Sequence, residues 1–459
     1  MKILMMRPRP SKDTIGLQHL MIVEPLELEV LAGSVNEDII IVDMILEKQK
    51  VEYFIEKHKP RVFCVTGYIS HVQIMLDYCK AVKNFDSTII TVAGGIHLEV
   101  KSEIFDSPWI DFRVVRNATS IFPTLIDSIK KSIITNGNSF DSQLIKTPPG
   151  ILKQGESIKE LPPFDFYFPI PRRDLVKKYQ KKYFYLVYDK VALLKTSFGC
   201  PYTCNFCFCR KITGGKYIER NLEEVIQELE GLWQKSIYII DDNFLVSEKR
   251  VRAFIQALKT KNIQKQYLIY GRVDFIAEHE SLIEEFTEMG LKGIIVGIES
   301  FDEQELKHYN KNQTRDSIDK ALHIMNRLKL DILATMIVSP DWEEADFKKL
   351  QQRLRKFNIK FANIQPLTPL PGIDLHINPD QIIIDPNDFD KWDLAHVMIK
   401  PEKLSVKRFY QYLLQSYLKT ILRPKQIINQ LRYPLKTQCR MFLGVFRVYR
   451  QYKWRIKNA

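Results

Sequence analysis

Short apolar runs alternate with segments of helical periodicity along roughly the first 130 residues of the chain. In the helical segments, such as residues 72–83, apolar side chains recur every three or four positions, as on a helix with one buried face. The apolar runs are continuous, which is typical of strands buried on both faces of a parallel sheet. This pattern predicts a doubly wound sheet with strands at residues 3–6, 39–42, 62–66, 89–93 and 112–115.

Two glycine-containing turns follow strands of this predicted sheet. They are Thr66-Gly67-Tyr68 and Gly94-Gly95-Ile96-His97. Ligands of doubly wound sheets bind beyond the carboxyl ends of the strands. We therefore expect the ligand site of this region near these turns.

The pattern is interrupted once and then resumes. Six prolines fall between residues 147 and 171, where helical periodicity is lost, and they indicate a linker. Six further strand and helix pairs follow, with strands expected at 191–196, 237–240, 267–270, 293–297, 333–338 and 361–364. Such a series predicts an open or partial barrel whose active site lies at the carboxyl ends of the strands.

The last part of the chain predicts amphipathic helices. One run has Ser405 as N-cap and Pro424 as stop, and a second covers residues 441–449. We therefore expect an α/β protein with a doubly wound domain at 1–135, a proline-rich linker at 136–185, a partial (β/α)6 barrel at 186–372 and a mainly helical region at 373–459.

The net charge of +13 is unevenly distributed. Of the 68 Lys and Arg residues, fourteen lie between Lys403 and Ala459, where no Asp or Glu occurs, and the other 54 nearly balance the 55 acidic residues. The excess charge therefore belongs to the C-terminal helices. No run of about 18 apolar residues occurs, and the first residues do not resemble a secretory signal, so we expect a cytoplasmic protein.

Four of the seven cysteines lie within ten residues, at Cys200, Cys204, Cys207 and Cys209. This clustering argues against a disulfide framework and favours a metal site in a reducing compartment. Thiolates spaced by three and then two residues on one loop can bind three irons of a cubane and leave the fourth open to a substrate. A structural zinc site with Cys209 as fourth ligand is the alternative, although zinc ligands usually form two well-separated pairs.

The motif of Cys200, Cys204 and Cys207 resembles the signature of the radical S-adenosylmethionine (SAM) superfamily, and further segments extend the resemblance. In that family an aromatic residue lies beside the adenine of SAM, and a second motif contacts the amino group of its methionine moiety. Residues at the ends of later strands lie near the ribose or carboxylate of SAM, or along the cofactor. The corresponding positions here are Phe206, then Asp241 and Asp242, then Arg272, and finally Gly297 and Glu299. Each also has an ordinary interpretation, since the aspartates could cap a helix and Gly297 could serve packing.

The resemblance implies that the three cysteines hold a 4Fe-4S cluster and that these other residues bind SAM. It also implies reductive cleavage of SAM to methionine and a 5′-deoxyadenosyl radical, with a reductant such as flavodoxin or ferredoxin. An iron-sulfur electron carrier, which would need a fourth cluster ligand, is the alternative that is not an enzyme.

The order of a doubly wound domain, a proline linker and a barrel resembles the cobalamin-dependent radical SAM enzymes. In this comparison Gly94 and Gly95 form a turn that lets backbone approach the corrin, because glycine lacks a Cβ atom, and His97 is a candidate cofactor contact. The Asp-x-His-x-x-Gly pattern of many cobalamin domains is absent. The implied reaction is methylation of an unactivated carbon, and the alternative is a radical ring closure or oxidoreduction, with or without cobalamin.

The basic C-terminal helices allow three interpretations. Their apolar faces could pack on the barrel, or they could contact an anionic membrane or a nucleic acid. The amphipathic pattern favours a membrane over nucleic acid, since no recognition module accompanies it. Residues 392–401 also resemble those of cobalamin-dependent radical methylases of lipids such as hopanoids, which implies a small-molecule, lipid-like substrate and peripheral contact with the inner face of the membrane.

Overall fold

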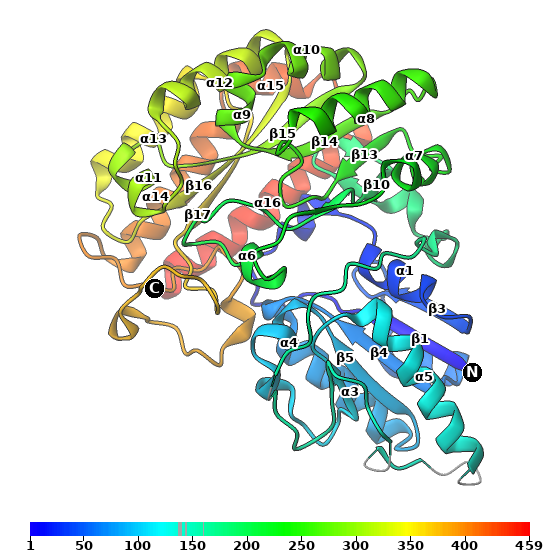
Figure 1. Ribbon diagram of the computed structural model, residues 1–459. Helices are drawn as coiled ribbons and strands as arrows, with labels where there is room; N and C mark the ends of the chain where they lie inside the picture. The colour runs from blue at the N-terminus through cyan, green and yellow to red at the C-terminus, as the bar shows by residue number, and fades with distance from the viewer. Residues whose placement is uncertain (136–139, 143–144, 159) are drawn as a thin grey trace. The chain divides into compact units, whose positions relative to one another are not determined.

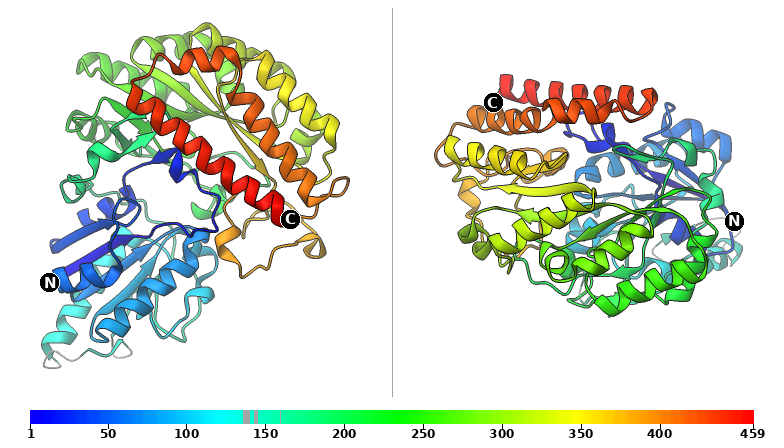
Figure 2. Two further views of the ribbon diagram at one scale, coloured as in Figure 1. Left: turned by 180° about the vertical axis from the view of Figure 1, so that it is seen from behind. Right: turned by 90° about the horizontal axis from the view of Figure 1, so that it is seen from above.

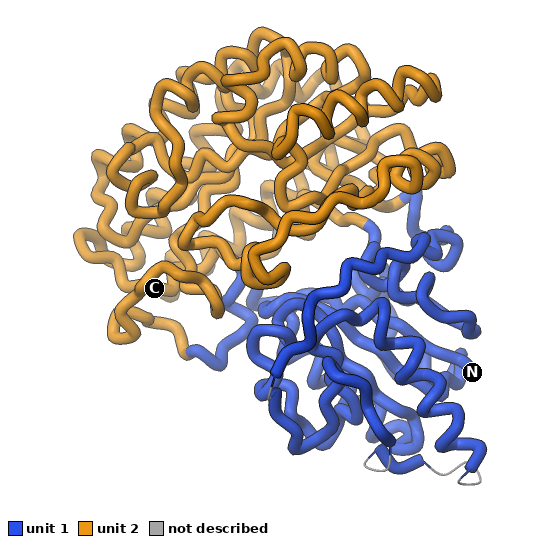
Figure 3. The backbone as a smooth tube through the Cα atoms, viewed as in Figure 1, with its two compact units in different colours: residues 1–14, 24–181, 386–393 blue, residues 15–23, 182–385, 394–459 orange. Residues whose placement is uncertain are grey.

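The computed structural model describes residues 1–135, 140–142, 145–158 and 160–459. The chain divides into two compact units (Figure 3). Unit 1 comprises residues 1–14, 24–181 and 386–393, and unit 2 comprises residues 15–23, 182–385 and 394–459. Of the expected linker at 136–185, residues 136–139, 143–144 and 159 lie outside the described residues, and residues 160–181 belong to unit 1.

Unit 1 is built on a six-stranded sheet with the strand order β3-β1-β4-β5-β6-β7 (Figure 1). The first five of these strands are parallel, and β7 pairs antiparallel with β6. Their bounds are β1 Lys2–Arg7, β3 Asp38–Asp43, β4 Val62–Thr66, β5 Ile90–Gly94, β6 Phe112–Val114 and β7 Ile151–Leu152. The predicted doubly wound sheet is confirmed.

Four helices of unit 1 form two packed pairs, α2 with α3 and α1 with α5. The helices are α1 Leu26–Gly33, α2 Val51–His58, α3 Val72–Phe85, α4 Ile96–Val100 and α5 Ala118–Thr135. All four residues from Ile3 to Met6 in the central strand β1 are fully buried, as expected for a strand covered on both faces. The strand order reverses between β1 and β4, and ligands of such sheets bind at this switch point.

Unit 2 contains six parallel strands in sequential order, β10-β13-β14-β15-β16-β17, which confirms the predicted partial barrel. The strands are β10 Val191–Leu194, β13 Ser236–Ile239, β14 Gln266–Gly271, β15 Leu291–Glu299, β16 Asp331–Val338 and β17 Phe361–Pro366. The helices between them are α7 Leu222–Glu230, α8 Glu248–Thr260, α9 Val273–Glu278, α10 Glu280–Glu288, α11 Glu303–His308, α12 Arg315–Arg327 and α13 Glu344–Lys356. The short helices α9 and α11 are not predicted by the apolar periodicity.

Three C-terminal helices complete unit 2: α14 Val406–Ile421, α15 Pro424–Gln430 and α16 Leu435–Asn458. The Ser405 side chain accepts a hydrogen bond from Arg408 N, which confirms it as the N-cap of α14. Pro424 follows the end of α14 as predicted, and it is also the first residue of α15, where its missing N–H costs nothing. α16 packs alongside α14 (Figure 2). Among the described residues, no helix is both long and apolar enough to cross a membrane.

Candidate active site

The cysteine loop projects from the carboxyl end of β10 and is closed at its base by a short antiparallel pair, β11 (Ser197–Phe198) and β12 (Ile218–Glu219). Gly199 has a φ of +78°, and a Cβ atom there would lie 2.0 Å from the carbonyl oxygen of Lys216. Only glycine therefore allows the two arms of the loop to approach this closely. The loop then runs into the short helix α6 (Cys209–Ile212; Figure 1).

The side chains of Cys200, Cys204 and Cys207 are all partly exposed in this loop. Burial raises the pKa of the Cys200 thiol to about 11. Burial also raises the pKa of Cys204, although the positive charges of Lys311 and Arg272 oppose that rise. Two cationic groups are thus close enough to Cys204 to oppose the effect of burial and stabilise its thiolate form.

The thiols of Cys207 and Cys209 are in direct contact. A hydrogen bond from the Cys209 thiol lowers the pKa of Cys207. Among the described residues, no group of three His, Cys, Asp or Glu side chains surrounds a position for a single metal ion. A cubane binds each thiolate to a different iron, so its ligands need not converge on one point.

Asp241, just after β13, anchors the segment that leads into the cysteine loop. Its carboxylate accepts hydrogen bonds from Thr196 N at 2.6 Å, from the Thr196 hydroxyl and from Ser197 Oγ at 2.7 Å. The next residue, Asp242, accepts from Gly199 N at 2.9 Å. Both aspartates therefore hold the backbone next to Cys200, and their predicted contact with SAM stays a prediction.

Arg272, directly after β14, connects three parts of the site. Its Nη1 lies 3.9 Å from Cys204 Sγ, and its guanidinium stacks on Tyr202 at 3.7 Å from the ring centroid. Nη2 donates to Asp274 Oδ2 and to the carbonyl oxygen of Lys311, both at 2.8 Å. The structure thus brings this predicted residue directly beside a predicted cluster ligand.

Glu299, at the end of β15, forms a buried ion pair with Lys311 at 3.1 Å. The two residues are only 7% and 6% exposed. A Cβ atom on Gly297 would lie 2.5 Å from Glu299 Oε1 and 2.8 Å from Lys311 Nζ, so glycine at this position leaves room for the pair. Glu299 itself has a φ of +61°, an unusual conformation for a residue with a side chain, and it follows an irregularity in the pairing of β15 with β16.

Lys311 is the main site residue that the sequence does not predict. Its Nζ lies 5.6 Å from the centroid of the Phe206 ring, and Phe206 also packs edge-on against Tyr309. Asn205 donates to the carbonyl oxygens of His308 and Tyr309, which fixes the cysteine loop against the segment carrying Lys311. A single lysine between two asparagines matches no motif, so only the folded chain reveals this role.

In unit 1, the two predicted glycine turns meet at the carboxyl edge of the sheet. Gly95 has a φ of +124°, and a Cβ atom there would lie 2.6 Å from the carbonyl oxygen of Gly67. Gly94, in contrast, has room for a side chain, since its nearest neighbour would be Val114 at 3.9 Å. Gly95 therefore allows the two turns to approach each other closely, and the approach of this backbone to a corrin stays a prediction.

His97 follows this turn but is buried in unit 1, with only 4% of its surface exposed. Its ring contacts Phe105 and Phe389 at centroid distances of 6.2 and 6.1 Å. Burial lowers the pKa of His97 to about 4, so the ring is neutral at pH 7. Its Nε2 has no hydrogen-bond partner in the part of the chain that the structure describes, and a role as cofactor contact stays a prediction.

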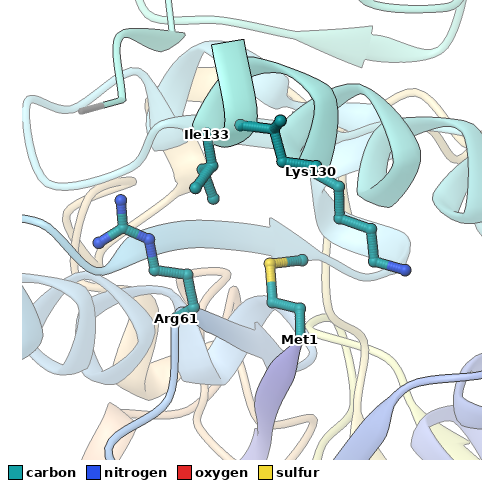
Figure 4. Close-up of a pocket in the computed structure, with 5 residues that line it drawn as sticks. Met1, Arg61, Lys130 and Ile133 are labelled. Carbon is teal, nitrogen blue, oxygen red and sulfur yellow. The ribbon is translucent and has the colours of Figure 1, made fainter. Parts of the chain in front are cut away.

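A hollow of about 380 Å³ lies elsewhere in unit 1 (Figure 4). It is lined by Met1, Arg61, Lys130, Ile133 and Ile134. Met1 and Arg61 directly precede β1 and β4, so the hollow lies at the amino ends of the strands. This is the opposite edge from the glycine turns, and it is not the expected ligand position.

Comparisons with protein families agree with this geometry. Residues 194–354 match the model of the radical SAM superfamily, and residues 14–126 match that of the B12 binding domain. The chain is a radical SAM enzyme with a B12-binding domain. This result sets aside the electron-carrier alternative.

Curated relatives of this radical SAM enzyme align over most of its length. It is 25% identical to a hopanoid C-3 methylase from Methylococcus capsulatus over 91% of this chain and 79% of the relative. It is also 25% identical to an uncharacterized methyltransferase from Pyrococcus horikoshii, over 98% and 99% of the two chains. An anaerobic magnesium-protoporphyrin IX monomethyl ester cyclase from Rubrivivax gelatinosus is 24% identical over 86% of this chain and 73% of the relative.

Two solved structures share the fold at low sequence identity. The cobalamin-dependent SAM radical enzyme OxsB, with aqua-cobalamin and SAM bound, gives a TM-score of 0.68 at 12% identity and covers 98% of this chain and 71% of that chain. The radical SAM methyltransferase TsrM from Kitasatospora setae gives a TM-score of 0.65 at 12% identity, with 99% of each chain covered. At this identity the likeness establishes the fold alone.

The two domains imply three cofactors, namely a 4Fe-4S cluster, SAM and cobalamin. The residues present fit these groups. Three thiols on one loop, with cations beside them, suit an iron-sulfur cluster. The glycine turns lie at the carboxyl edge of the unit 1 sheet, where ligands of such sheets bind, and the buried Nε2 of His97 beside them has no partner among the described residues.

Proposed function

We propose that this enzyme methylates an unactivated carbon of a lipid-like small molecule in a cobalamin-dependent radical reaction. The observation that supports the radical reaction in this proposal is the group of side chains around the cysteine loop. Arg272 and the Glu299–Lys311 ion pair adjoin Cys204 and Phe206 at the carboxyl ends of one parallel sheet. In parallel barrels this is the end at which catalysis takes place.

We assign the cluster to Cys200, Cys204 and Cys207. When bound, the cofactors supply reductive cleavage of SAM, hydrogen abstraction and a transferable methyl group. The chain's own residues bind these cofactors and orient them. Asp241 and Asp242 fix the backbone before the first cysteine by the hydrogen bonds described above.

SAM contacts are assigned to Phe206, Asp242, Arg272, Gly297 and Glu299. Phe206 offers an aromatic face for adenine, and the carboxylates and guanidinium offer partners for the charged methionine end. Asp241 is likewise assigned to SAM, and its carboxylate also anchors the backbone before the first cysteine. Gly94, Gly95 and His97 are assigned to the cobalamin side.

The lipid-like substrate is supported by the relative named hopanoid C-3 methylase. A radical SAM enzyme also needs an external reductant, and we propose a flavodoxin or ferredoxin. A lipid substrate would be met at the inner face of the membrane, so we further propose peripheral membrane association of an otherwise cytoplasmic protein.

The reaction can be tested with anaerobically reconstituted protein, dithionite and SAM carrying a trideuterated methyl group. We expect release of 5′-deoxyadenosine, and trideuteromethyl products when a hopanoid-containing bacterial lipid extract is added. Formation of 5′-deoxyadenosine with an altered but unmethylated lipid would indicate the ring-closure or oxidoreduction alternative instead.

Cysteine variants provide the matched control. Cys207→Ala should abolish 5′-deoxyadenosine formation, because it removes a cluster ligand. Cys209→Ala, two residues further along the chain at the start of α6, should retain it. Equal loss in both variants would contradict the assignment of three ligands.

A further inference from the structure

The helices α15 and α16 carry an unusual exposed apolar surface. Of the eighteen large hydrophobic side chains that are exposed among the described residues, nine lie between Leu422 and Trp454. We call the following six the α15–α16 face: Ile427, Ile428, Leu431, Leu435, Phe442 and Phe446. Their exposed fractions range from 47% to 77%. Clustered apolar exposure of this kind marks an interaction site.

This face cannot turn inward, because the opposite side of α16 is already packed. Met441, Gly444, Tyr452 and Ile456 recur at helical spacing on that side and are all buried. A Cβ atom on Gly444 would lie 2.4 Å from the carbonyl oxygen of His19, so the helix is held tightly against its neighbour. The rotation of α16 is therefore fixed, and packing on the barrel does not account for the exposed residues.

Positive charge surrounds the α15–α16 face. Exposed basic side chains on or beside it include Lys425, Arg432, Lys436, Arg447 and Lys453. No acidic residue occurs anywhere from Lys403 to the last residue. The surface that would meet a partner is thus both apolar and uniformly cationic.

These properties fit an anionic lipid surface better than other partners. A symmetric contact with a second copy would bring like charges together, which costs free energy. Only Phe442 and Phe446 of this face offer a ring on which a nucleic-acid base could stack, and its other four residues are aliphatic. Aliphatic and aromatic side chains interleaved with Lys and Arg are typical of helices that lie in a membrane interface.

We propose that α15 and α16 dock on an anionic membrane leaflet, with the α15–α16 face in the acyl boundary and the basic side chains at lipid phosphates. This inference deepens the proposed membrane association, and it does not depend on the identity of the radical reaction. Each Lys or Arg near such a surface contributes about 1 kcal/mol to binding.

The inference can be tested by flotation of the full chain with phosphatidylcholine vesicles, with or without 30% phosphatidylglycerol. We expect at least tenfold stronger binding to the anionic vesicles, weakened by high salt. The triple variant Ile428→Ser/Leu431→Ser/Leu435→Ser and the triple variant Lys436→Glu/Arg447→Glu/Lys453→Glu should each lose at least tenfold in binding. Only exposed side chains change, so α14 and its packing stay intact.

The matched control is Ile134→Ser/Ile170→Ser, which removes two exposed apolar side chains from unit 1 and should leave vesicle binding unchanged. All variants should still release 5′-deoxyadenosine, so loss of docking and loss of the proposed reaction are distinguishable. Equal flotation of wild type and both triple variants would overturn the inference. Binding to single-stranded RNA that exceeds binding to anionic vesicles would overturn it as well.

Discussion

At the scale of single residues, the pair of Glu299 and Lys311 is the most sensitive feature of the site. Both side chains are almost fully buried, and each charge is balanced by the other. Replacing Lys311 by Met would leave a buried carboxylate without its cation. We expect Lys311→Met to destabilise unit 2 by about 3 kcal/mol, because the buried Glu299 carboxylate would lose its cation and its desolvation would no longer be offset.

Urea unfolding of the single and double variants checks this prediction. Glu299→Gln/Lys311→Met should be more stable than Lys311→Met alone, since the orphaned charge is also removed. Gly297→Ala should be destabilised as well, because its added Cβ atom overlaps the space of both partners. Wild-type stability in Lys311→Met would show that water enters and solvates the carboxylate.

His97 predicts a pH dependence for unit 1. Burial lowers the pKa of its ring to about 4 from the unfolded value of 6.5. Between these values the unfolded chain binds a proton that the folded chain does not, so stability falls as the pH drops from 6.5 towards 4. At pH 5 this amounts to about 2 kcal/mol.

The check is thermal unfolding of corrin-free protein at pH 7 and pH 5. His97→Phe keeps an aromatic ring against Phe105 and Phe389 and should lose less stability on acidification than wild type. His71, whose pKa burial also lowers to about 4, accounts for part of the remaining slope. An identical pH slope in the variant would rule out the contribution of His97.

At the scale of elements, helix α14 protects the open edge of the barrel sheet. Its Tyr417 hydroxyl accepts a hydrogen bond from Ile364 N at 2.9 Å and donates one to the carbonyl oxygen of Ile364 at 2.8 Å. Ile364 lies in the last strand, β17, whose outer side pairs with no further strand in the described part of the chain. One side chain thus satisfies both backbone groups of an edge residue.

We expect Tyr417→Phe to destabilise unit 2 by about 1–3 kcal/mol, since it leaves a buried donor and a buried acceptor without a partner. Thermal unfolding and hydrogen exchange at the Ile364 amide check this. Tyr449→Phe, on the neighbouring helix α16 and packed on the same core, is the matched control. Equal melting temperatures for the two variants would contradict the capping role.

The elements also show what local pattern can and cannot predict. Continuous apolar runs identify the strands of both sheets, because buried parallel strands need apolar side chains on both faces. Helices α9 and α11 have only six residues each, too few for the apolar period to repeat clearly. The sequence also does not predict that the α15–α16 face is exposed. The same apolar period would occur whether that side of the helices packed against the rest of the unit or not.

In the candidate active site, too, local sequence patterns predict some features and not others. Cysteine spacing identifies the cluster loop because the chemistry depends on local separation along the chain. The contact of Lys311 with Arg272 and the hydrogen bond of Asp241 with Thr196 each join residues that lie far apart in sequence and meet only on folding. The spacing of residues along the chain carries no information about such contacts. The sequence therefore predicts a cofactor contact for Asp241 and does not reveal that its carboxylate anchors the backbone.

At the scale of the whole molecule, each of the two units has its own sheet and its own apolar core. The cysteine loop belongs to unit 2 and the Gly67 and Gly95 turns to unit 1. Each candidate cofactor site is thus built from the fold of one unit, and loading of one should not require loading of the other.

Two variants of the full chain test this independence. Gly95→Val places a branched side chain where even a Cβ atom would lie 2.6 Å from the carbonyl oxygen of Gly67, so we expect loss of bound corrin with normal iron and sulfide content. Cys200→Ala/Cys204→Ala/Cys207→Ala should lose the cluster and retain corrin, which its visible spectrum reports. Thermal unfolding of each variant distinguishes a lost site from a lost fold. Simultaneous loss of both cofactors from two folded variants would mean that the sites are coupled, because each unit's own fold would then be insufficient to hold its cofactor.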